Sequence, residues 1–272
     1  MSIERETYLH GHHRSVLSAH SARTADDAAA FLLPHIEPGM NLLDVGCGPG
    51  TITLGLAAAV GESGYVIGID VSDGLQEEWD RRLMEHGLPN LVFQVDNIYK
   101  SNLEHDRFDV VYAHQLLQHL GDPVGALMAA SKLAKPGGIV GVREVDWGTF
   151  AAYPESRALD DFRRVYDAVA IRSGGNPRAG RNMLSWMEDT GVLTEIHIST
   201  STWTFFEESG KTWWGDQWSQ RILESDIAAK ALEYGIATRT ELEAISRGWQ
   251  EWKNAPGSLS CFTHFEGLAR RI

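Results

Sequence analysis

Residues 42–50 read Leu-Leu-Asp-Val-Gly-Cys-Gly-Pro-Gly, and this short stretch decides the fold. An apolar run reaches a carboxylate, Asp44, and enters a turn in which every second residue is glycine; residues 51–60 continue as a helix-like segment. Glycines at alternate positions leave the backbone bare, so a ligand can lie directly against it. The start of the next helix offers N–H groups without a helical partner and a partial positive charge. The stretch therefore predicts a small-molecule site at the carboxyl end of a strand, where open α/β sheets bind ligands.

The spacing of the glycines argues against a dinucleotide ligand. The dinucleotide fingerprint G-x-G-x-x-G/A requires a small residue at its sixth position. Counted from Gly46 that position is Thr51, and a count from Gly48 also fails because threonines follow Gly50. The chain carries D-x-G-x-G-x-G instead, and Asp44 would repel a pyrophosphate but attract a ligand with an ammonium or sulfonium group.

The composition excludes several classes of protein. A chain of 272 residues can bury a full core, and its formal net charge of -13 repels nucleic acid. It has neither an apolar run near the roughly 20 residues of a membrane span nor a basic amphipathic segment, so we expect no membrane partner. The two cysteines, Cys47 and Cys261, and a polar N-terminus without a signal peptide indicate a reducing, cytoplasmic location. We expect a monomer or homodimer whose partner is a small molecule.

Strand-like and helix-like segments alternate along the first half of the chain. We expect strands at 41–45, 65–69, 91–94, 108–113 and 139–144, with helices at 24–33, 51–60, 72–86 and 123–133. In the tail we expect strands at 195–205 and 260–268 and helical segments at 156–187 and 206–254, the latter rich in tryptophan. Helices between successive strands indicate βαβ units with right-handed crossovers. The pattern therefore predicts an α/β fold with a doubly wound, mostly parallel sheet.

The D-x-G-x-G-x-G run resembles the first motif of class I S-adenosylmethionine-dependent methyltransferases. Residues 115–120, Gln-Leu-Leu-Gln-His-Leu, are similar to the L-x-H-L segment of the ubiquinone-biosynthesis branch of this family, and residues 135–138, Lys-Pro-Gly-Gly, match a common family turn. The resemblance implies a seven-stranded sheet with one antiparallel strand near the C-terminus. It also implies one domain over 1–272, with a helical lid at 1–33, a cofactor-binding core at 40–150, and helical inserts at 151–190 and 206–255 that cover the acceptor.

The same resemblance names S-adenosylmethionine as the cofactor and gives roles to residues at the strand ends. Asp44 would orient the methionine ammonium, Asp70 would accept from the ribose hydroxyls, and Asp96 would accept from the adenine amino group. Each carboxylate also has a plain structural alternative, as a cap of its own turn or of the next helix. The predicted contact set is Asp44, Gly46, Cys47, Gly48, Gly50, Asp70, Val71, Asp96, Asn97, Ile98, Ala113, His114 and, from the lid, Tyr8.

The acceptor is expected beyond the fourth and fifth strands, on the side that the sulfonium faces in this family. A base is required only if the acceptor must lose a proton, and the candidates are His119 and then Glu144. The candidates for binding the acceptor are Asp146, Trp147 and His13. No metal is expected, because the His12-His13 pair lacks the three or four convergent ligands that a metal site needs.

The resemblance implies an enzyme that transfers a methyl group from S-adenosylmethionine to a small molecule by in-line displacement, releasing S-adenosylhomocysteine. One alternative is a protein of the same fold that binds the cofactor in a regulatory or non-methylating role. The other is a nicotinamide-dependent oxidoreductase, which the glycine spacing and the lack of a Y-x-x-x-K pair disfavour. The identity of the acceptor, and whether its O, N, C or S atom is methylated, stay open.

Overall fold

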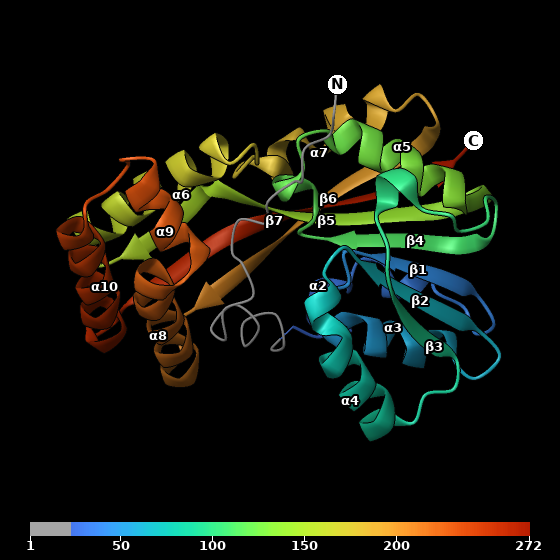
Figure 1. Cartoon of the computed structure of the whole chain (residues 1–272), viewed down its shortest axis with the longest axis horizontal. Coiled ribbons are helices and arrows are strands. Elements are labelled where there is room, and N and C mark those ends of the chain that lie inside the picture. Colours follow the sequence, from blue (N-terminus) through green and yellow to red (C-terminus); the bar gives the residue numbers. More distant parts are fainter. Residues whose placement is uncertain (1–22) are drawn as a thin grey trace.

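The chain builds a mixed β-sheet with helices on both faces (Figure 1). The computed structural model describes residues 23–272, and within them the strand order is β3-β2-β1-β4-β5-β7-β6. The strands are β1 (Asn41–Val45), β2 (Tyr65–Asp70), β3 (Leu91–Val95), β4 (Phe108–His114), β5 (Ala134–Tyr153), β6 (Leu193–Phe205) and β7 (Leu259–Arg271). Strands β1 to β5 run parallel, whereas β7 is antiparallel to both β5 and β6. The predicted seven-stranded sheet with one antiparallel strand near the C-terminus is therefore confirmed.

The strand order reverses at β1, the strand that leads into the glycine loop. The chain moves from β1 through β2 to β3 on one side, then returns to β4 on the other side. Helices α2 (Ala25–Ala28), α3 (Thr51–Val60) and α4 (Gln76–His86) pack on one face of the sheet, and α5 (Pro123–Leu133) and α7 (Ala179–Asp189) pack on the other. A crevice at the carboxyl ends of β1 and β4 follows from this reversal.

Strands β5, β6 and β7 extend well past the other strands and carry a helical layer (Figure 1). Its helices are α6 (Arg157–Arg172), α8 (Glu208–Glu224), α9 (Asp226–Glu233) and α10 (Arg239–Asn254). The prediction that the fifth strand ends at residue 144 is wrong, because β5 continues to Tyr153 and pairs with β7 across a register shift between Asp146 and Ala151. Trp147 and Phe150 on this extension lie in an aromatic core shared with the helices. Burial of these two large side chains stabilises the extended part of the strand.

Local sequence signals explain the start of helix α5 but give the wrong length for the helix near residue 24. Helix α5 begins with Pro123 after Asp122, whose side chain accepts a hydrogen bond from the Gly125 N–H. The helix expected over residues 24–33 is shorter, since α2 ends at Ala28 and a turn leads into the 3₁₀ helix η1 (Leu33–His35). The intervening Leu32 is fully buried in the core beneath the sheet. Burial here takes precedence over helix propensity.

Residues 1–22 lie outside the described part of the chain. The predicted contacts of Tyr8 and His13, and most of the predicted lid, fall there and stay predictions. From residue 23 onward, no helix combines the length and the apolar character that crossing a bilayer requires.

Candidate functional site

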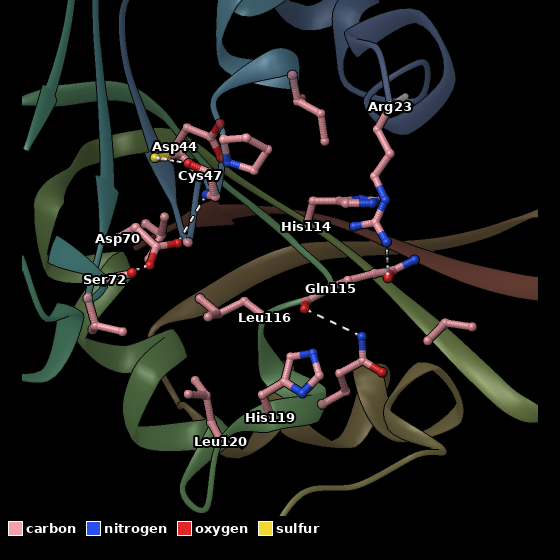
Figure 2. A pocket seen from close by; sticks show the side chains of 18 of the residues that line it. Arg23, Asp44, Cys47, Asp70, Ser72, His114, Gln115, Leu116, His119 and Leu120 are labelled. Atoms are coloured by element: carbon pink, nitrogen blue, oxygen red, sulfur yellow. Dashed lines mark hydrogen bonds between the residues drawn. The ribbon is translucent and has the colours of Figure 1, made fainter. Parts of the chain in front are cut away.

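A cavity of about 190 Å³ opens at the carboxyl ends of β1, β2 and β4 (Figure 2). Its glycine-loop end is lined by residues from the segments 44–52, 69–75 and 96–99. Its aromatic end is lined by seven rings and two arginines, which are Trp147, Tyr166, Trp203, Trp213, Trp214, Trp218 and Phe262 with Arg23 and Arg221. The cavity also meets the loop that follows β4. One opening thus joins a backbone cradle to an aromatic pocket.

Most of the site residues predicted from the sequence come together around this cavity. Those that line it are Asp44, Gly46, Cys47, Gly48, Asp70, Val71, Asp96, Asn97, Ile98, His114, His119 and Trp147. Four predicted residues are not among the lining residues, and these are Gly50, Ala113, Glu144 and Asp146. Of these, Ala113 is buried in the hydrophobic core between the sheet and α5.

The glycines of the loop serve different purposes. Gly48 has φ of +52°, and a Cβ atom built on it meets no protein atom within 4 Å, so a side chain there would enter the cavity that Gly48 lines. Gly46 instead lies against Leu116, whose Cδ1 would be 2.9 Å from an added Cβ. At Gly50 an added Cβ would collide with the ring of Phe93. The prediction that Gly50 contacts the cofactor is therefore replaced by a packing role, whereas Gly48 leaves a cradle for a ligand.

Asp70 holds the glycine loop in place. Its Oδ2 accepts a hydrogen bond from the Gly48 N–H at 3.0 Å, and its Oδ1 accepts one from the Ser72 N–H at 3.0 Å (Figure 2). Each carboxylate oxygen has a second lone pair. The side chain is only half-buried, so Asp70 can cap its own turn and still accept from a ligand hydroxyl.

Asp96 and Ile98 form the far wall of the glycine-loop end. The Asp96 carboxylate accepts from the Asn97 N–H at 2.7 Å and from the Ser101 hydroxyl at 2.6 Å. Ile98 begins the 3₁₀ helix η3 (Ile98–Lys100) and is buried while lining the cavity. This pairing of a carboxylate with an apolar side chain suits a flat heterocycle that carries an amino group.

Asp44 is a buried carboxylate at the floor of the cavity. It is 2% exposed and accepts a hydrogen bond from the Thr53 hydroxyl at 2.7 Å. Burial raises its pKa to about 7; the bond from Thr53 opposes the rise, and the charge of Asp70 adds to it. A cationic group bound beside Asp44 would favour the ionised carboxylate and lower that pKa again.

Glu144 supports the loop that follows β4. It is fully buried, and its Oε1 accepts a hydrogen bond from the Leu117 N–H at 2.6 Å. Burial raises its pKa to about 8, against the lowering effect of hydrogen bonds from the backbone of Leu116, Leu117 and Gln118. The prediction that Glu144 faces the acceptor as a base is corrected, because Glu144 is not among the residues that line the cavity and its Oε1 accepts from the loop instead.

Asp146 is likewise engaged away from the cavity. Its carboxylate accepts from Arg181 on α7, with Oδ2 at 2.5 Å from Nε and Oδ1 at 3.1 Å from Nη2. Oδ1 also accepts from the Gly148 N–H at 2.8 Å. The prediction that Asp146 binds the acceptor is corrected to a structural role, since this two-point ion pair fixes α7 to the extended part of β5.

His119 lies in the cavity but is a weak base. Burial, together with the positive charges of Arg23 and Lys230, lowers its pKa to about 3. The ring is consequently neutral at physiological pH. A neutral imidazole with so low a pKa provides little driving force for removing a proton from an acceptor.

We predict that His119 contributes to acid sensitivity. Its pKa is lower in the folded chain than the 6.5 of an ordinary histidine, so the unfolded chain binds more protons between these values. Stability is therefore lost as the pH falls from about 6.5 towards 3. Urea unfolding at two pH values should show a smaller acid-induced loss in His119→Gln than in the wild type. Replacing the exposed His105 in the same way is the control, and equal losses in all three proteins would contradict the prediction.

Reasoning from the sequence missed the two arginines of the aromatic end. Arg23 donates from Nη2 to the side-chain oxygen of Gln115 at 3.0 Å (Figure 2). The Arg221 guanidinium lies 5.2 Å from the ring centroid of Trp218. The density of tryptophans signals the aromatic end, but nothing in the sequence near either arginine indicates that it faces a cavity.

Within residues 23–272 no three His, Cys, Asp or Glu side chains gather in a way that could hold a metal ion. The carboxylates at the ends of β1, β2 and β3, the open backbone at Gly48 and the aromatic end together suit a nucleoside-bearing cation beside a second small molecule.

A doubly wound sheet with a glycine cradle after β1 and acidic residues at successive strand ends defines a class of Rossmann-like proteins that bind a nucleoside cofactor in this crevice. Residues 36–191 match the family described as methyltransferase domain. The chain belongs to this family, the class I S-adenosylmethionine-dependent methyltransferases, and S-adenosylmethionine is the cofactor.

Relatives support this assignment, and solved structures share the fold. An uncharacterized methyltransferase of Schizosaccharomyces pombe is 33% identical over 96% of this chain and 94% of its own. A ubiquinone biosynthesis O-methyltransferase of Methylococcus capsulatus is 35% identical, but over only 40% of this chain and 46% of its own. The YcgJ protein of Bacillus subtilis has a TM-score of 0.57 at 16% identity, covering 89% of this chain and 97% of that one. The [4+2]-cyclase SpnF has a TM-score of 0.53 at 20% identity, covering 94% and 79%; both structures share the fold.

Proposed function

We propose that the chain methylates a small molecule that binds at the aromatic end of the cavity. The observation that carries this proposal is the continuity of one cavity from the open backbone at Gly48 to the aromatic rings. Bound S-adenosylmethionine supplies an electrophilic methyl group on a sulfonium. The protein then has to hold an acceptor atom in line with that group and exclude water, which are positioning tasks.

The glycine-loop end has a residue for each part of the cofactor. Asp44 orients the methionine ammonium, and Gly48 leaves room for the ligand against the backbone. Asp70 accepts from the ribose hydroxyls, and Asp96 with Ile98 receives the adenine. The backbone at His114 borders the methionine portion.

Neither of the two residues predicted as a base suits that role. His119 is neutral but has a pKa of about 3, and Glu144 lies outside the cavity lining. We therefore assign acceptor activation to positioning, with the acceptor arriving already able to attack. His119 then contacts the acceptor as a neutral hydrogen-bonding ring.

The two alternatives to a methyltransferase are a cofactor-binding protein without methylating activity and a nicotinamide-dependent oxidoreductase, and each predicts a different result in binding experiments. A cofactor-binding protein without methylating activity would bind S-adenosylmethionine yet release no S-adenosylhomocysteine with any acceptor. Such a role is compatible with the fold, which the cyclase SpnF shares. A nicotinamide-dependent enzyme would prefer NADH. The predicted cytoplasmic location and the monomeric or dimeric state remain part of this proposal.

We predict that the chain binds S-adenosylmethionine and S-adenosylhomocysteine with roughly micromolar or lower Kd and binds NADH far more weakly. The physical reason is that Asp44 and Asp70 favour a cation and a ribose at a loop unsuited to a pyrophosphate. Isothermal titration with the three ligands measures this order. Tighter binding of NADH would reject the methyltransferase proposal, and a metabolite screen for S-adenosylhomocysteine release separates an enzyme from a binding protein.

A further inference from the structure

Helix α3 buries one polar side chain, and that side chain is Thr53. The other buried residues of this helix are all apolar, and they are Ile52, Leu54, Leu56, Ala57 and Val60. Thr53 is 0% exposed and is not among the residues that line the cavity. Valine has the same branched shape without the hydroxyl, so packing alone does not require threonine here. The hydroxyl needs another explanation, because burying it without a partner would cost free energy.

The partner of the Thr53 hydroxyl is the carboxylate of Asp44 at the end of β1. The hydroxyl donates to Oδ2 at 2.7 Å, and both side chains are buried. A threonine in a helix can donate to a backbone carbonyl one turn earlier, but this one donates across to the strand. Asp44 lines the cavity and Thr53 does not, so the hydroxyl acts on the cavity only through the carboxylate.

Two other donors close to this carboxylate are committed elsewhere. Tyr112 pairs with Asp44 in the register of β4 and β1, but its phenol donates to a backbone carbonyl of α2 at 2.6 Å. The Cys47 thiol donates to the carbonyl of the next residue. Burial and the charge of Asp44 raise the pKa of both groups, so both stay protonated near neutral pH. Among the described residues, Thr53 is therefore the hydrogen-bond donor that holds the Asp44 carboxylate.

The charges around Asp44 make this hydrogen bond important. Burial raises the pKa of Asp44, the charge of Asp70 at the end of β2 adds to the rise, and the Thr53 hydrogen bond opposes both. The resulting pKa of about 7 means that a small change in this environment alters the ionised fraction near neutral pH. Two further ionisable side chains line the same cavity, His114 at the end of β4 and Arg23 ahead of α2, so a test has to separate them from Asp44.

We infer that Thr53 is a positioning residue for the cofactor, whose hydroxyl holds one oxygen of the Asp44 carboxylate and leaves the other to the ammonium of the methionine portion. This inference rests on the proposed function, because it concerns the carboxylate that the proposal assigns to that ammonium. The hydrogen bond also favours the ionised form of Asp44. Part of the affinity for the cofactor therefore depends on a hydroxyl that does not touch it, and the dependence is greatest where Asp44 titrates.

Two ligands that differ in the amino-acid portion test the inference. S-Adenosylhomocysteine carries the ammonium, whereas 5′-methylthioadenosine has the same nucleoside and sulfur without the amino acid. In the wild type, binding of S-adenosylhomocysteine should weaken as the pH falls through about 7, because Asp44 becomes protonated. Binding of methylthioadenosine should change much less over the same range. Asp44→Asn should remove the difference between the two pH profiles, which a contribution from His114 or Arg23 would leave in place.

Thr53→Val removes the hydroxyl and keeps the branched shape. It should weaken S-adenosylhomocysteine binding by about 5- to 10-fold near pH 7 and move the midpoint of its pH profile up by about one pH unit, the usual scale of a hydrogen bond to a charged group. Methylthioadenosine should bind almost as before, and Thr53→Ser, which keeps a hydroxyl, should recover most of the affinity. Thr190→Val is the matched control, since Thr190 is a buried threonine outside the cavity lining whose hydroxyl also donates at 2.7 Å. It should bind both ligands like the wild type.

The outcomes separate this inference from the proposed function. Failure of the wild type to bind S-adenosylhomocysteine at any pH counts against the proposed function. If it binds, equal pH profiles for the two ligands in the wild type overturn the inference about Thr53 alone, whether or not any variant folds. Equal weakening of both ligands in Thr53→Val, or no recovery in Thr53→Ser, would leave Thr53 as a packing residue. Thr53→Ala allows the same comparison if the protein does not tolerate valine.

Discussion

Replacing Gly48 with asparagine should weaken binding of S-adenosylhomocysteine by about 100-fold or more, because the new side chain would occupy the space that the ligand needs. Gly48 lines the cavity, and an added Cβ would meet no protein atom within 4 Å. The fold should therefore have room for the side chain even though the ligand does not. Asparagine is chosen because it tolerates positive φ better than other side chains, and Gly48 has φ of +52°. Isothermal titration gives the affinity, and a melting curve without ligand gives the stability.

Gly87 provides a matched control for this substitution. It ends α4 with φ of +59°, and an added Cβ there also meets nothing within 4 Å, but it does not line the cavity. Gly87→Asn should bind S-adenosylhomocysteine like the wild type. If Gly48→Asn retains wild-type affinity, the loop is only a turn and the cofactor does not approach it. If both variants lose affinity, backbone conformation rather than the cradle is responsible.

The core of the fold was predictable because local and long-range signals agree there. The apolar run ending at Asp44, the glycine turn and the helix at 51–60 all appear where expected. The length of β5 was not predictable, because its far half, including Trp147 and Phe150, is stabilised by β7 and by the separate helices α6, α8 and α10. A pattern of apolar residues says that a segment is buried, but not which distant partner buries it.

The candidate site was predictable where function depends on the backbone and on strand ends. Asp44, Gly48, Asp70 and Asp96 lie at one cavity because parallel strands bring their carboxyl ends to the same edge. Side-chain direction was harder to predict. Glu144 sits at the expected edge, yet its carboxylate supports the Leu117 backbone instead of facing the cavity.

The burial of Arg221 in the helical layer could not be predicted from the sequence either. Arg221 looks like one more charged residue of an amphipathic helix until α8 is placed over the sheet. Its burial depends on how the helices of the tail pack around Trp218, which no local pattern encodes. The cofactor could thus be inferred from the sequence, whereas the residues that line the aromatic end of the cavity became evident only in the three-dimensional arrangement.

Removing the Asp70 carboxylate should weaken S-adenosylhomocysteine binding by about 100-fold, since two charge-assisted hydrogen bonds to the ribose would be lost. The loop would also lose the acceptor for the Gly48 and Ser72 N–H groups. Asp70→Ala tests this, and Asp70→Asn, which keeps one acceptor oxygen, should fall between Asp70→Ala and the wild type. Asp73→Ala, at an exposed carboxylate three residues later, is the control and should bind normally.

A comparison of two nucleosides separates ribose contact from support of the loop. If Asp70 contacts the ribose, the wild type should prefer adenosine to 2′,3′-dideoxyadenosine, and Asp70→Ala should lose that preference, because the hydroxyls would have no carboxylate to meet. If Asp70 only supports the loop, both nucleosides weaken together and their ratio stays the same. Measuring both nucleosides with both proteins forms a double-mutant-type cycle. It isolates the interaction between Asp70 and the ribose hydroxyls, since each change removes one side of that contact. An undiminished preference for adenosine in Asp70→Ala would assign the ribose to another residue and leave Asp70 as a cap of its own turn.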